Sequence, residues 1–193
     1  HTRLRCGWSS DVCSSDLSGS GAVVAAGIVP ASLGSDTGGS VRLPAAACGL
    51  VGIKPTHGLV GRSGVIALSQ SLDTVGPLTR SVRDGAIVLQ AISAVDDEDS
   101  SSVPFDFPDL LHNLEDGLAG LRIGWPSNHF FENTEGSVAD GIDEVFRLMG
   151  RLGAECVDVE VPGIEIANAM TMLIIAVRSE ERRVGKECRS RWS

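Results

Sequence analysis

Residues 34–49 read GSDTGGSVRLPAAACG, and this stretch decides the fold and the chemistry that we expect of the chain. Its first half predicts a loop, because glycine and small polar residues favour turns. Its second half predicts a short helix with Pro44 in the first turn and Gly49 at the end. Ser40 then lies near the helix N-terminus, whose partial positive charge favours an anion.

The first chemistry that such a loop could support is phosphate binding by main-chain amides. A Walker loop requires a lysine after its last glycine, and here Ser40 follows Gly39. The dinucleotide fingerprint also needs a different glycine spacing. The stretch therefore fits neither of the common phosphate-binding motifs.

The second chemistry is that of an aspartic protease, since Asp36, Thr37 and Gly38 form the tripeptide DTG. Two such aspartates must share a proton to divide the acid and base roles. The chain contains one DTG, so this interpretation requires a symmetric dimer.

The third chemistry makes Ser40 a nucleophile. A serine hydroxyl attacks a carbonyl only when a base is in reach and donors stabilise the oxyanion. The backbone N–H groups from Thr37 to Ser40 could provide those donors. Three histidines are candidates for a Ser-His-Asp system, although none lies in a motif: His57, His112 and His129.

Both ends of the chain differ in character from its middle. The run from Asp11 to Leu17 and the run from Arg178 to Cys188 are what two common sequencing adapters encode when translated. We therefore expect residues 1–17 and 178–193 to be adapter-derived and residues 18–177 to be a partial domain of the natural protein.

The composition of residues 18–177 excludes several functions. Eight of the 16 Lys and Arg and five of the 25 Asp and Glu lie in the two ends, so this segment has a net charge of −12. Such a charge disfavours nonspecific nucleic-acid binding.

Cys48 and Cys156 suggest neither a disulfide framework nor a zinc site, so we expect a reducing cytoplasm and no metal. No apolar run reaches the roughly 18 residues of a membrane span.

Hydrophobic periodicity predicts both helices and strands. Residues 21–27 suit a buried helix, residues 49–78 read as loops and short strands, and residues 79–94 as a helix that begins near Ser81. Strands are expected at 121–126 and 154–161, with a helix at 137–153 between them. The apolar face of that helix is Val138, Ile142, Val145, Met149 and Leu152. Strand, helix, strand implies an α/β fold with strands that can lie parallel.

The run from Gly34 to Val82, with DGAIVLQAI, LAGLRIGWP and LGAECVDVEVP after it, closely resembles the amidase signature family, serine amidohydrolases with a Ser-cisSer-Lys triad. The resemblance implies a mixed β-sheet covered by helices, of which this chain is a fragment. It also implies that Ser40 is acylated and that the amides of Thr37, Gly38 and Gly39 form the oxyanion hole. Asp36 and Arg42 would brace the loop.

The chain departs from the family pattern upstream of Ser18. Aligned on SGSG at 18–21, the bridging serine should fall at position 16, which is Asp16, and Leu17 replaces the next serine. The catalytic lysine of the family lies further upstream, and Lys54 is not a candidate for its role. We therefore expect the parent protein to be an amidase and this chain to be nearly inactive.

The functional hypothesis is a C–N hydrolase that acts on a small-molecule amide, without a cofactor or direct nucleic-acid contact. The alternative within the family is the amidase component of a glutamyl-tRNA amidotransferase, which works with partner subunits. VGRSGVIALSQSLDTVGPLTR (60–80) looks more like general amidases, because the amidotransferase component typically has Tyr and Gln at the positions of Ser63 and Thr74. A noncatalytic interaction module is the alternative from another class. The sequence does not indicate the oligomeric state.

Overall fold

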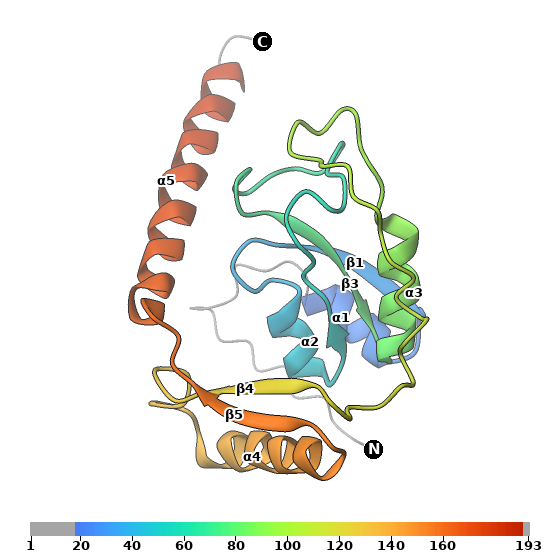
Figure 1. Cartoon of the computed structure of the whole chain (residues 1–193). Helices are drawn as coiled ribbons and strands as arrows, with labels where there is room; N and C mark the ends of the chain where they lie inside the picture. Colours follow the sequence, from blue (N-terminus) through green and yellow to red (C-terminus); the bar gives the residue numbers. More distant parts are fainter. Residues whose placement is uncertain (1–17, 191–193) are drawn as a thin grey trace. The chain divides into compact units, whose positions relative to one another are not determined.

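The computed structural model describes the backbone of residues 18–190 and the side chains of residues 19–177. The predicted adapter-derived run 11–17 lies outside the described residues, and the run 178–188 is described by its helical backbone alone. The chain divides into two compact units, residues 1–112 with 172–193 and residues 113–171. The elements, shown in Figure 1, are α1 (Ser18–Ala25), β1 (Ala31–Asp36), α2 (Arg42–Cys48), β2 (Val51–Gly52), β3 (Thr74–Thr79), α3 (Val82–Ile92), β4 (Arg122–Pro126), α4 (Gly136–Arg151), β5 (Glu155–Val159) and α5 (Ile164–Ser190).

The first unit is built around an antiparallel sheet in which β3 lies between β1 and β2. Every residue of β3 is buried. Helix α1 contacts β1 and β3, and helix α3 also contacts β3 (Figure 1). The last pair in the β1–β3 register is Asp36 with Thr74, so β1 places Asp36 beside the start of β3.

Local patterns predicted much of this unit. Helix α2 ends at Gly49 in the left-handed conformation, and the Ser81 hydroxyl accepts a hydrogen bond from the Asp84 amide at the start of α3, as expected. The loops and short strands of 49–78 are also confirmed. Strand β1 was not predicted, because Gly, Ser and Asp are uncommon in strands; pairing with β3 along its whole length stabilises it.

Two small apolar clusters form the core of the first unit. The first joins Val41 and Ala45 to Leu78 of β3, and the second joins Val60, Val75 and Leu89. Val41 directly follows Ser40 and is fully buried, so the first cluster anchors the loop that the sequence singles out.

The second unit has the predicted strand, helix, strand order, and β4 and β5 pair in parallel. Phe146 of α4 packs on Trp125 of β4 with ring centroids 4.3 Å apart, and Phe131 stacks on the same indole at 4.8 Å. The Phe146–Trp125 contact is thus an aromatic link between α4 and β4.

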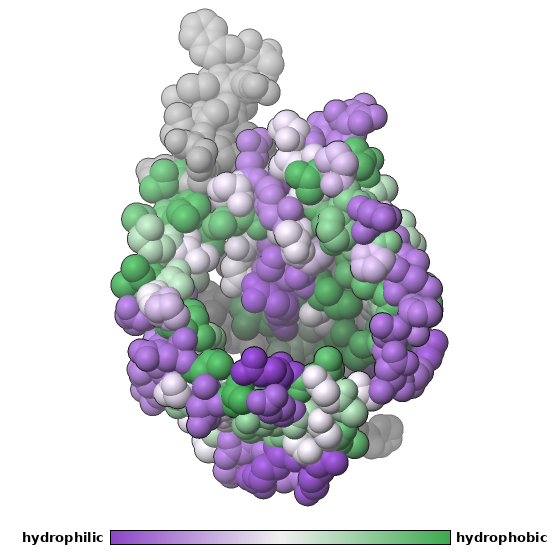
Figure 2. All heavy atoms as spheres, in the orientation of Figure 1, coloured by the Kyte–Doolittle hydropathy of each residue, from purple (hydrophilic) through white to green (hydrophobic). Residues whose placement is uncertain are grey.

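The apolar face expected for α4 is only partly covered. Four of its five residues remain 39–55% exposed: Val138, Ile142, Val145 and Leu152. The predicted helix is confirmed, and its apolar face stays partly at the surface because two strands are too narrow to cover it. Figure 2 shows hydrophobic residues at the surface between hydrophilic ones.

Helix α5 begins at Ile164 and has apolar residues at its surface, among them Ile166 and Leu173. Among the residues that the structure describes, no helix is long and apolar enough to cross a membrane.

Candidate active site

Ser40 lies in the turn that joins β1 to α2. The strand ends at Asp36, and the helix begins at Arg42, so Ser40 is two residues before the helix. Gly39 has φ 129°, a conformation that favours glycine, and an added Cβ would lie 3.0 Å from the Leu43 side chain. The Ser40 side chain is partly exposed, and among the described residues its hydroxyl has no hydrogen-bond partner.

The Asp36 carboxylate organises this turn from inside. It is fully buried and accepts the Gly39 amide at 2.7 Å, the Val41 amide at 3.2 Å and the Arg42 amide at 3.4 Å. The Arg42 guanidinium adds two hydrogen bonds, both 3.0 Å, from Nε and Nη2. The loop therefore folds around an anion that the chain itself supplies.

Electrostatics keep this carboxylate ionised. Burial raises the pKa of Asp36, but hydrogen bonds from Arg42 and from the Gly39 and Val41 amides, together with the charge of Arg42, outweigh burial and lower the pKa overall. A carboxylate held in this way is unsuited to share a proton, as an aspartic protease requires. The phosphate-binding alternative also fails here, because three loop amides already bind Asp36.

Two of the residues predicted to form the oxyanion hole, Gly39 and Thr37, make hydrogen bonds to aspartates. The Gly39 N–H is committed to Asp36, so it points toward the carboxylate in this conformation. The Thr37 hydroxyl donates a hydrogen bond to Asp73, a buried residue that sequence reasoning did not identify. No sequence pattern indicates this pair, because 36 positions separate the two residues.

His57, a candidate base, and Lys54, which is not one, both have hydrogen-bond partners away from Ser40. His57 Nε2 lies 3.2 Å from the Gln70 carbonyl, and Lys54 Nζ donates to the Pro55 carbonyl at 2.8 Å. Within the described part of the chain no hydrogen bond joins Ser40 to a histidine. The same residues hold no group of three or more His, Cys, Asp or Glu that could bind a metal ion.

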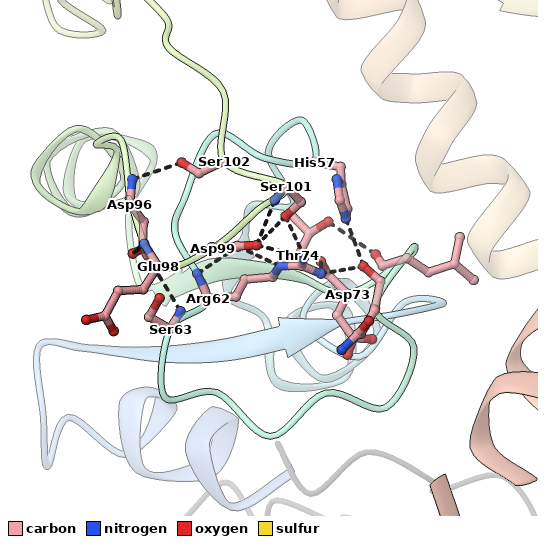
Figure 3. Close-up of polar contacts among 12 residues, drawn as sticks. His57, Arg62, Ser63, Asp73, Thr74, Asp96, Glu98, Asp99, Ser101 and Ser102 are labelled. Carbon is pink, nitrogen blue, oxygen red and sulfur yellow. Dashed lines mark hydrogen bonds and ion pairs between the residues drawn. The ribbon is translucent and has the colours of Figure 1, made fainter. Parts of the chain in front are cut away.

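A second polar network lies around Arg62 (Figure 3). The guanidinium donates to Asp99 at 3.0 Å, to the Gln70 carbonyl at 2.6 Å and to the Asp73 carbonyl at 3.2 Å. The Arg62 and Ser101 hydrogen bonds lower the pKa of Asp99 despite its burial. Arg62 therefore joins three segments of chain that are far apart in the sequence.

These segments surround a pocket of about 200 Å³. Its walls include the side chains of Arg62, Asp73 and Asp99. Asp73 lines this pocket and also accepts a hydrogen bond from Thr37, so it connects the pocket wall to the Ser40 loop.

Comparison with known proteins gives a consistent result. The family described as Amidase matches residues 9–187, which overlaps both predicted adapter-derived ends. The A subunit of glutamyl-tRNA(Gln) amidotransferase from Salinibacter ruber is 47% identical over 156 residues, or 81% of this chain and 30% of that protein. The chain thus spans about a third of the length of such relatives.

Solved structures of similar sequence share the fold. The corresponding amidotransferase component from Thermotoga maritima superposes with a TM-score of 0.81 at 41% identity, over 90% of this chain and 39% of that one. A peptide amidase from Stenotrophomonas maltophilia gives a TM-score of 0.69 at 40% identity, over 75% of this chain and 30% of that one. Mixed helices and strands in this arrangement confirm the predicted α/β class.

Proposed function

Because the chain belongs to the Amidase family, we propose that it carries the nucleophile of an enzyme that hydrolyses carboxylic amides through an acyl-enzyme. Ser40 Oγ attacks the amide carbonyl, the amine leaves with a proton, and water then releases the acid and restores the hydroxyl. The observation that carries the proposal is the turn itself. Ser40, whose hydroxyl has no hydrogen-bond partner among the described residues, stands where buried Asp36 and its partner Arg42 fix the backbone.

Main-chain amides stabilise the tetrahedral intermediate in this proposal. The resemblance assigns the oxyanion hole to Thr37, Gly38 and Gly39. Since the Gly39 amide is bound to Asp36, the Thr37 and Gly38 amides carry the larger share. Asp36 and Arg42 act indirectly, by holding the loop backbone in place.

The general base is assigned by resemblance to a lysine that acts through a bridging serine. The resemblance places the bridging serine at position 16, where this chain has Asp16, and the lysine further upstream. Position 16 lies outside the described residues. A base of this kind must be neutral, which burial of a lysine favours. We therefore assign the reaction to the full-length protein, in the cytoplasm, with no cofactor required.

A second candidate is the amidase component of a glutamyl-tRNA amidotransferase, favoured by the 47% identity to such a protein. Ser63 and Thr74 favoured a general amidase in the sequence, but the residue at position 74 distinguishes the two functions only in part. The Thr74 side chain is buried in β3 and its hydroxyl bonds the Leu72 carbonyl, so sheet packing constrains that position. In this alternative the substrate is glutamine and the partners are other subunits together with tRNA.

The test uses the full-length protein, expressed from the locus after resequencing across both ends. Simple amides and glutamine are offered with and without hydroxylamine, and glutamine also with tRNA and partner subunits. An acyl-enzyme predicts hydroxamate formation at the expense of the acid. Turnover of simple amides alone supports the amidase, whereas turnover only with glutamine, tRNA and partners supports the amidotransferase. No hydroxamate and no turnover of any substrate would leave the interaction module as the function.

A further inference from the structure

The side chain of Thr37 links the Ser40 loop to a distant part of the first unit. Its hydroxyl donates to Asp73 Oδ1. The β1–β3 register ends at Asp36 and Thr74, so Thr37 and Asp73 occupy the next opposed positions, where the two strands separate. A side-chain hydrogen bond thus continues the pairing by one residue beyond the sheet.

Asp73 is itself fixed in place. The residue is 1% exposed, and its Oδ2 accepts the Leu68 amide at 2.6 Å and the Ser69 amide at 3.0 Å. The Asp73 carbonyl accepts a hydrogen bond from Arg62. With one carboxylate oxygen and the carbonyl held, the carboxylate cannot rotate freely, and Oδ1 stays directed at Thr37.

The loop between Asp36 and Ser40 has few other anchors. Gly38 and Gly39 have no side chain and a wide range of backbone conformations. Thr37 is therefore the residue between Asp36 and Ser40 whose side chain can fix the loop. Its own amide is one of the two that the proposed function uses as oxyanion donors.

We propose that Asp73 is a positioning residue that holds Thr37, and through it the Thr37 amide, in the orientation that receives the oxyanion. The inference rests on the proposed function. A donor that is set before the reaction requires no reorganisation in the transition state, which is why its placement affects kcat more than KM.

The test compares three variants of the full-length protein. Thr37→Val keeps the shape but removes the donor to Asp73, and Asp73→Asn/Thr37→Val tests whether the two residues act as a unit. Thr74→Val is the matched control, because it removes a buried threonine hydroxyl that, within the described part of the chain, bonds only the Leu72 carbonyl. Amide hydrogen exchange of residues 37–40 and steady-state kinetics on a simple amide are measured for each.

For Thr37→Val we expect exchange of the loop amides to rise by about tenfold, and kcat to fall by roughly 10–100-fold with KM within twofold. The double variant should be no slower than Thr37→Val, and Thr74→Val should match the wild type. Exchange unchanged in Thr37→Val would overturn the inference even if the wild type had no amide turnover. An active wild type with unchanged kcat in Thr37→Val, or a KM effect alone, would also overturn it.

Discussion

The Ser40 loop and helix α4 both carry arginine–carboxylate pairs, but their surroundings differ. Asp36 is fully buried and its pair with Arg42 also includes three main-chain amides. On α4, Arg147 and Glu144 pair at 2.9 Å while their side chains remain 63% and 57% exposed.

The difference shows where polar groups determine structure. A buried carboxylate must have all its hydrogen bonds satisfied, so each one constrains the surrounding backbone. An exposed pair competes with water and contributes little. In the first unit the buried Asp36–Arg42 pair therefore fixes the backbone beside Ser40. In the second unit the exposed pairs of α4 mainly keep the helix surface solvated.

The largest expected effect is on catalysis. Ser40→Ala in the full-length protein should reduce amide turnover by about 10⁴-fold or more, because the nucleophile is lost. Its counterpart in the second unit is Ser127→Ala, since among the described residues that hydroxyl bonds only the Val159 carbonyl, and this variant should retain turnover within about twofold. Initial rates on a simple amide measure both. Similar rates for the two variants would show that the chemistry does not depend on the Ser40 loop.

The next effect concerns two glycines, one in each unit. A Cβ at Gly76 of β3 would lie against the Ile53 carbonyl oxygen, whereas a Cβ at Gly141 of α4 would meet no described atom within 4 Å beyond its chain neighbours and the nearby backbone of its own helix. We expect Gly76→Ala to reduce the unfolding free energy by about 3 kcal/mol or more. Gly141→Ala should raise it by about 0.5–1 kcal/mol, because alanine favours helix. Denaturant titrations of the two variants test this, and equal effects would contradict the packing described for β3.

A smaller contrast separates the two kinds of ion pair. Arg62→Met leaves Asp99, whose side chain is 8% exposed, without its cation and should reduce the unfolding free energy by about 3 kcal/mol. Arg147→Met removes two exposed ion pairs, with Asp143 and Glu144, and should change the unfolding free energy by about 0.5 kcal/mol or less. Both are measured by denaturant unfolding. If Arg147→Met were as costly as Arg62→Met, burial would not be what distinguishes the two networks.

The smallest effect is a pH dependence. Because the pKa of Asp36 is lowered in the folded state, its stabilisation is complete above about pH 4 and is lost as the pH falls through the folded pKa. Asp36→Asn should therefore lose less stability than the wild type between pH 4 and pH 2. The Asp36→Asn variant should still lose some stability at low pH, because the pKa of Asp99 is also lowered in the folded state. An unchanged pH profile in Asp36→Asn would show that this carboxylate is not the one that titrates.

The parts of the fold that could be predicted depend on neighbours in the sequence. Gly49 ends α2 and Ser81 begins α3 through contacts within a few residues, and the parallel β4–α4–β5 order follows from apolar periodicity. Strand β1 depends instead on β3, which lies about 40 residues downstream, so its own residues gave no indication of it.

The candidate site shows the same limit. The motif around Ser40 was recognisable because its residues are contiguous. The Thr37–Asp73 contact spans 36 positions, and that between Arg62 and Asp99 spans 37. An aspartate in a serine-rich loop reads as a turn residue, and only the fold reveals that it supports the loop at Ser40.

The most direct test of the account is to map the residue that a fluorophosphonate modifies in the full-length protein. A nucleophilic serine displaces fluoride and keeps the phosphonyl group, and mass spectrometry of the peptides then locates the adduct. We predict a single adduct on Ser40, which is lost in Ser40→Ala and retained in Ser127→Ala. An active enzyme whose adduct lies on another residue would contradict the assignment of Ser40 as the nucleophile.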